Sequence, residues 1–197
     1  MNINWNYPQP RQGISGALDK LIGPGATPAE VWLQVVPAVL AGIVVPVHAI
    51  VSSLAWSPLQ LFIGALLAFD LTGGIITNAT SSAKRWYHRP GQGFSQHLVF
   101  VVIHVIHVFV VAWLFRSHDW PFFGIVSAYL LVASVIILHT PQYLQRPVAL
   151  MLFALTLLIN TYTLTSTVGL EWFVPFFYLK LLVSHLLKEA PYQPAGE

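Results

Sequence analysis

Long apolar runs separated by short polar breaks dominate the chain from residue 31 onward. The run 31–69 carries no formal charge and is interrupted at Trp56-Ser57-Pro58, so it predicts two helices; 90–115, 120–145 and 147–170 are also charge-free. A membrane-spanning helix needs about 20 predominantly apolar residues, and these runs are long enough. The pattern predicts six helices, over residues 30–54, 58–78, 95–115, 121–139, 146–163 and 170–187.

The start of the first long helix is well marked. Residues 27–30, Thr-Pro-Ala-Glu, provide an N-cap, a proline at the first helical position and a glutamate at the third, which is a capping box. Upstream, Ile14, Leu18 and Leu21 share one face of a short helix, a pattern typical of segments that lie on a membrane surface. We therefore expect an N-terminal segment over 1–27, a six-helix transmembrane domain over 28–188 and a C-terminal tail over 189–197.

Charged residues are scarce. Nine Lys or Arg and seven Asp or Glu make up 8% of the 197 residues, against roughly 25% in a soluble domain. This excludes a water-soluble globular protein, and the abundance of apolar and aromatic residues excludes a disordered chain. The net charge of +2 is too small for a nucleic-acid surface, and the absence of Cys excludes disulfides and thiolate ligands. The predicted fold class is an all-α, polytopic integral membrane helix bundle that contacts membrane lipids; a homo-oligomer is left open.

The basic residues lie mainly on one side of the predicted bundle. With the N-terminus inside and six spans, the outer loops hold only Arg116, whereas the inner segments hold Arg11, Lys20, Lys84, Arg85, Arg89, Arg146 and Lys188. Cytoplasmic loops are enriched in Lys and Arg. This bias predicts a multi-pass protein of the cell membrane with both termini in the cytoplasm.

Two charged residues lie at membrane depth, where ionisable groups are costly and usually paired or functional. Asp70 is in the second predicted helix, on one face with Gly74 and Thr77, and small residues there let a neighbouring helix approach closely. Lys180 lies at matching depth in the last predicted helix. We expect an ion pair between Asp70 and Lys180, which is compatible with a role of Asp70 as proton donor, base or metal ligand.

Histidines supply most of the remaining chemistry. His97, His104 and His107 share one stripe of the third predicted helix, and His139 and His185 lie near the cytoplasmic ends of the fourth and sixth. Interhelical hydrogen bonding is the structural interpretation of such imidazoles. Imidazole and carboxylate are also the ligands expected for zinc or iron when no thiolate is present. This predicts a divalent metal bound by His97, His104, His139, His185 and Asp70.

The leading functional interpretation is a membrane-embedded metalloenzyme, a hydrolase or an oxygenase. Its site would open toward the cytoplasm and accept a lipid or isoprenoid as a small-molecule substrate. The predicted catalytic residues are Asp70, Asn78 and His104. Capture of the substrate phosphate or headgroup is assigned to the basic residues Arg85, His88, Arg89 and Lys180.

Three other functions fit the same residues. A proton-coupled transporter would use Asp70, Lys180 and the histidines as a relay, but no repeated half is evident in the chain. A metal-free prenyl cyclase or isomerase would use Asp70 to protonate its substrate, and the aromatic side chains would stabilise cations. A protein binding haem b needs two histidines at equal depth on facing helices. The pairs that fit are His48 with His104 or His107, and His97 with His139 or His185.

Overall fold

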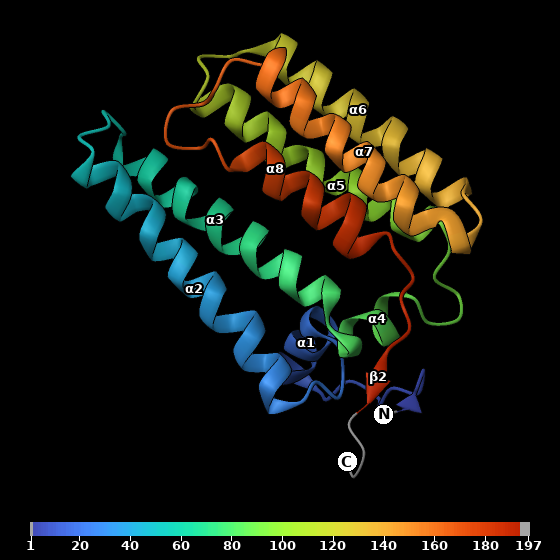
Figure 1. The fold of residues 1–197 in the computed structure, drawn as a ribbon. Coiled ribbons are helices and arrows are strands. Elements are labelled where there is room, and N and C mark those ends of the chain that lie inside the picture. Colours follow the sequence, from blue (N-terminus) through green and yellow to red (C-terminus); the bar gives the residue numbers. More distant parts are fainter. Residues whose placement is uncertain (1, 194–197) are drawn as a thin grey trace.

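A computed structural model, which describes residues 2–193, shows a helical bundle (Figure 1). Within these residues five helices are long and apolar enough to span a membrane: α2 (Pro28–Val51), α3 (Pro58–Ala79), α5 (Phe94–Leu114), α6 (Trp120–His139) and α7 (Gln142–Tyr162). The first five predicted helices are confirmed. Their ends shift by at most four residues, and the largest shift is at the start of α7.

The sixth predicted span is shorter than expected. The chain forms α8 (Phe173–Tyr178), which continues as a π-helix, η1 (Leu179–His185). At about 1.5 Å per residue this segment is about 20 Å long, less than the roughly 30 Å hydrocarbon core of a bilayer. It runs through the bundle interior against α3, α6 and α7, and Phe177 and Leu181 are fully buried there. Helix length alone therefore supports five spans.

The remaining elements gather at one end of the bundle (Figure 1). The strand β1 (Asn2–Ile3) pairs antiparallel with β2 (Tyr192–Gln193), so the start of the chain and its last described residues lie together. Residues 194–197 of the predicted tail lie outside the described residues. A short helix, α4 (Ser81–Tyr87), lies in the segment between the second and third predicted helices, where no helix was predicted; this basic segment holds Lys84, Arg85, His88 and Arg89.

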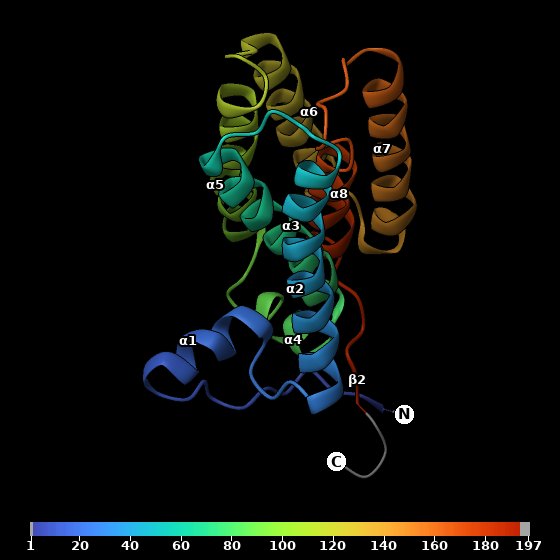
Figure 2. The same ribbon diagram turned by 90° about the vertical axis from the view of Figure 1, so that its left-hand side faces the viewer.

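The predicted N-terminal helix is present as α1 (Gly13–Ile22). Figure 2 shows that it projects sideways from the base of the bundle. Ile14, Leu18 and Leu21 are 84%, 51% and 61% exposed on it. An exposed apolar face on a helix at the end of a membrane bundle is the arrangement expected of an interfacial helix.

Glu30 joins the start of α2 to the start of α4. Its Oε2 accepts a hydrogen bond from the Thr27 backbone N–H at 2.8 Å, while Thr27 Oγ1 accepts from the Glu30 N–H at 3.2 Å, so the predicted capping box is confirmed. Its second oxygen, Oε1, accepts from the Ser82 backbone N–H at 3.0 Å. One carboxylate thus caps α2 and holds α4 beside it.

Replacing Glu30 with Ala should lower the stability of the detergent-solubilised protein by about 1 kcal/mol, because a cap and the link to α4 are both lost. Thermal unfolding followed by circular dichroism measures the change. Glu171→Ala is the matched control, since the Glu171 carboxylate accepts a local bond from the Gly169 N–H. An equal loss in both variants would contradict a special role for Glu30.

Candidate functional site

A cavity of about 330 Å³, which we call the Asp70 cavity, lies between α1, α2, α3, α4, α5 and η1. Its size falls in the range of about 300–1,000 Å³ usual for ligand pockets. Leu21, Val35, Phe69 and Phe100 are among its apolar walls. The polar side chains that line it are Gln34, Asp70, Thr77, Asn78, Tyr87, His104 and Lys180. Apolar walls with a few convergent polar groups are typical of small-molecule sites.

The predicted ion pair between Asp70 and Lys180 is present. Lys180 Nζ donates to Asp70 Oδ2 at 2.6 Å, and His107 Nε2 lies 3.0 Å from the same oxygen. The Asp70 side chain is 44% exposed, whereas those of Lys180 and His107 are 3% and 19% exposed. Lys180 and His107 therefore both contact Oδ2, and part of the Asp70 side chain stays open to the cavity.

Gly74 makes room for this ion pair. A Cβ atom at Gly74 would lie 2.3 Å from Lys180 Cε and 2.7 Å from Cδ, so any side chain there would displace the lysine. Gly73 plays a different part, because its Cβ would meet the Cβ of Ala38 on α2 at 3.1 Å. The packing role predicted for small residues on this face is confirmed, with α2 on one side and η1 on the other.

The π-helix η1 brings a second buried group to α3. His185 Nδ1 lies 3.3 Å from Asn78 Oδ1, and His185 Nε2 lies 3.2 Å from His97 Nδ1. Lys180 and His185 are five residues apart, which in an α-helix would separate them by about 140°. The i→i+5 bonding of a π-helix brings residues at this spacing nearly onto one face. Both side chains can therefore reach α3.

The hydrogen bonds around His185 have a defined direction. Asn78 Nδ2 donates to the Gly74 carbonyl at 2.8 Å, so its Oδ1 accepts from His185 Nδ1–H. With neutral rings, His185 Nε2 then accepts from His97 Nδ1–H, and His88 Nε2–H donates to the His185 carbonyl at 3.0 Å. Burial lowers the pKa of His88, at the end of α4, to about 3, so that ring is neutral at pH 7. This is the interhelical hydrogen bonding expected of packed histidines.

His104 differs from these histidines because it lines the Asp70 cavity. Its Nδ1–H donates to the Phe100 carbonyl at 2.7 Å, and its ring stacks on His107 with centroids 5.2 Å apart and planes within 6°. The backbone bond fixes the tautomer, so Nε2 carries the lone pair. A histidine oriented in this way can act as a base toward a ligand.

The predicted metal ligands do not form one group. His97 contacts His185, Asp70 and His104 line the cavity, and His139 is exposed on α6, where its ring lies 4.9 Å from that of Phe94. Within residues 2–193 no three His, Asp or Glu side chains are placed to hold a metal ion. The predicted set therefore does not fit a single metal centre, and zinc or iron stays a prediction.

His48, the predicted haem ligand, is exposed on α2. Its Nδ1 lies 3.3 Å from the Ser52 hydroxyl. Within the described chain it makes no hydrogen bond or ring contact to His104 or His107, whose ring nitrogens bond to carbonyl groups and to Asp70. The structure does not bring this pair together, and haem b also remains a prediction.

Three of the four residues predicted to bind the substrate headgroup lie outside the Asp70 cavity. Arg85 and His88 are buried, and the Arg89 guanidinium lies 3.7 Å above the Trp86 ring and donates to the Trp86 carbonyl. None of these three lines the Asp70 cavity, whereas Lys180 does. The basic segment therefore packs mainly against the protein itself.

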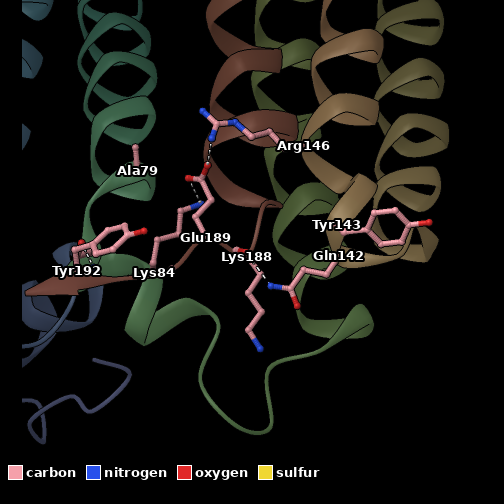
Figure 3. A pocket seen from close by; sticks show the side chains of 10 residues that line it. Ala79, Lys84, Gln142, Tyr143, Arg146, Lys188, Glu189 and Tyr192 are labelled. Carbon is pink, nitrogen blue, oxygen red and sulfur yellow. Dashed lines mark hydrogen bonds and ion pairs between the residues drawn. The ribbon is translucent and has the colours of Figure 1, made fainter. Parts of the chain in front are cut away.

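A second hollow, of about 860 Å³, opens beside α4, the start of α7 and the C-terminal segment (Figure 3). Here Glu189 lies between Lys84, at 3.6 Å, and Arg146, at 3.9 Å. Lys84 Nζ also donates to the carbonyls of Ser184 and Leu187 at 2.7 and 2.5 Å, and burial lowers its pKa to about 8. The Lys188 ammonium lies 5.1 Å from the Trp5 ring. Lys84 and Arg146 thus contact the C-terminal segment, and Lys188 of that segment contacts Trp5.

Two features in and beside the Asp70 cavity were missed by sequence reasoning. The π-helix has no local signal in a uniformly apolar stretch, so the sequence did not predict the joint orientation of Lys180 and His185. Gln34 was missed because a neutral amide does not stand out by charge in an apolar run. A single glutamine within the apolar run that forms α2 was the signal available.

The chain matches no family model, no curated protein and no solved structure. Function must therefore be argued from the site itself.

Proposed function

We propose that the protein is a membrane-embedded enzyme that transfers a proton to or from a lipid-like substrate bound in the Asp70 cavity. The observation that carries this proposal is the ion-paired but 44% exposed carboxylate of Asp70, set in an apolar-walled cavity at membrane depth. A charge kept accessible in such a place is costly and marks a functional site by default. The apolar walls favour a substrate that enters from the lipid phase.

The roles follow from the contacts of each group. His104 is the base, because its Nδ1–H is fixed on a carbonyl and Nε2 carries the lone pair. Lys180 is the cation that can stabilise developing negative charge on the substrate, and Asp70 orients it. This differs from the acid role considered for Asp70, since a carboxylate held at 2.6 Å by an ammonium is poorly suited to give up a proton. Asn78 is a positioning residue for His185.

The proposal includes six spans in the cell membrane, with both termini cytoplasmic. The two strands that pair near the chain ends support an even number of crossings, with the segment Phe173–His185 as the sixth. The positive-inside rule supports the orientation, because Lys84, Arg146 and Lys188 lie beside these strands.

Solvent deuterium tests the chemistry even when the product has not been identified. Membranes that contain the protein, supplemented with total lipid extract of the expressing cells, are incubated in D₂O, and the lipids are analysed by mass spectrometry. We expect one lipid or isoprenoid species to gain deuterium with the wild type. His104→Gln should slow this by about 10²-fold, the usual effect of removing a general base.

His139→Gln is the matched control, because His139 is an exposed histidine that does not line the cavity. It should exchange deuterium like the wild type. Deuterium incorporation equal to that of membranes lacking the protein would refute the proposal.

A further inference from the structure

Gln34 carries an unexplained buried amide. It lies on α2, is 3% exposed and lines the Asp70 cavity. Neither Nε2 nor Oε1 has a hydrogen-bond partner among residues 2–193. A glutamine amide offers two N–H donors and an acceptor oxygen, and leaving these buried and unpaired is costly. Packing alone therefore does not explain why a glutamine stands at residue 34.

The other buried amide of the cavity, Asn78, is bonded to the Gly74 carbonyl and to His185. Tyr87 donates to the backbone at the end of α1, and Lys180 is paired with Asp70. Gln34 thus differs from Asn78, Tyr87 and Lys180, whose side chains make hydrogen bonds within the protein.

Close packing of α2 on α3 keeps the Gln34 backbone in place. A Cβ atom at Gly73 would lie 3.1 Å from Ala38 Cβ and 3.9 Å from the Gln34 carbonyl oxygen. The helix cannot easily rotate to carry the amide out to solvent. Both amide atoms are buried, and Gln34 lines the cavity, so a change of its side-chain rotamer would let a ligand in the cavity supply the missing partners.

We propose that Gln34 recognises an uncharged polar end on an apolar chain, a hydroxyl or an amide, which supplies both a donor and an acceptor. This deepens the proposed function, on which it rests, by naming the substrate class. Among the described lining residues Lys180 is the one Lys or Arg, and Asp70 already neutralises it. The charges of Lys180 and Asp70 are opposite and equal, so the pair can stabilise a small charge that develops on the substrate but leaves no net positive charge for a phosphate. The cavity therefore selects against the phosphorylated headgroup expected from the sequence.

Three probes with the same sixteen-carbon chain test the recognition: hexadecanol, hexadecyl phosphate and hexadecane. Native mass spectrometry of the protein released from detergent micelles counts the bound molecules. We expect one hexadecanol per chain, bound at least tenfold more tightly than either of the other probes.

Gln34→Leu should weaken hexadecanol binding about tenfold. It should also raise the melting temperature of the protein without added probe, because an unpaired amide is replaced by an apolar group. These opposite effects separate recognition from a structural role. Gln34→Met provides a second apolar variant of similar length, and Gln92→Leu, in the segment before α5 and outside the cavity, should change neither quantity.

Tighter binding of hexadecyl phosphate by the wild type, no binding of any probe, or unchanged hexadecanol affinity in both Gln34 variants would overturn this inference. Deuterium transfer that occurs alongside an unchanged affinity would overturn the inference and leave the proposed function standing. Binding of hexadecanol that depends on Gln34, without deuterium transfer to any lipid, would refute the proposed function and support the inference.

Discussion

Replacing Lys180 with Met should destabilise the protein by about 2–3 kcal/mol, less than the usual cost of removing one partner of a fully buried ion pair, because Asp70 is 44% exposed and keeps His107 at 3.0 Å. The change leaves the Asp70 carboxylate without the ammonium that lies 2.6 Å away, in apolar surroundings. Asp70→Asn should cost a similar amount, because Lys180 is 3% exposed and would keep an unpaired charge. Thermal unfolding in a mild detergent measures both losses.

The double change Asp70→Asn with Lys180→Met should recover most of the stability, since no unpaired charge remains. Deuterium transfer should stay lost, because the cation that stabilises the substrate is gone. Arg146→Met is the control for removing a positive charge, as Arg146 is 75% exposed and 3.9 Å from Glu189, and it should change stability little. A double variant that both folds and transfers deuterium normally would reduce the pair to a structural role.

The ion pair could be predicted because depth along two helices was enough to match its partners. Hydropathy likewise located the five long helices, and residues 27–30 gave the capping box. These features depend on position along the chain or along the membrane normal. Each can be read from one sequence without knowing which helices are neighbours.

The structure does not bring the five predicted metal ligands together, because a single sequence does not show the direction in which each helix face points. His97, His139 and His185 were placed at similar depth, yet only His97 and His185 meet, while His139 lies on an exposed face of α6. In a membrane both lipid-facing and buried surfaces are apolar, so periodicity does not distinguish them as it does in water. The neighbours of a polar residue must come from the fold.

The neighbours of the basic residues in and after α4 could not be predicted from the sequence either. The sequence assigned this run of Lys, Arg and His to the positive-inside bias and to capture of a substrate headgroup. Instead, Lys84 binds the carbonyls of Ser184 and Leu187, His88 binds the His185 carbonyl, and Arg89 lies over Trp86. The end of a helix leaves carbonyl groups that need donors, and Lys84 and His88 supply them at the end of η1.

Gly74→Ala should destabilise the protein by about 1–3 kcal/mol, the usual range for overpacking, and should reduce deuterium transfer together with stability. The new Cβ would lie 2.3 Å from Lys180 Cε, and the lysine side chain is more easily displaced than the packed helices. We expect its ammonium to move away from Asp70. Thermal unfolding and deuterium incorporation measure the two effects.

Gly124→Ala is the matched control on α6, because a Cβ there meets no atom within 4 Å, and it should be neutral or slightly stabilising. Combining Gly74→Ala with Lys180→Met gives a sharper test. If the glycine acts by positioning the ammonium, its substitution should cost little once that ammonium is gone, so the two effects should not add. Fully additive losses would mean that Gly74 acts on helix packing alone.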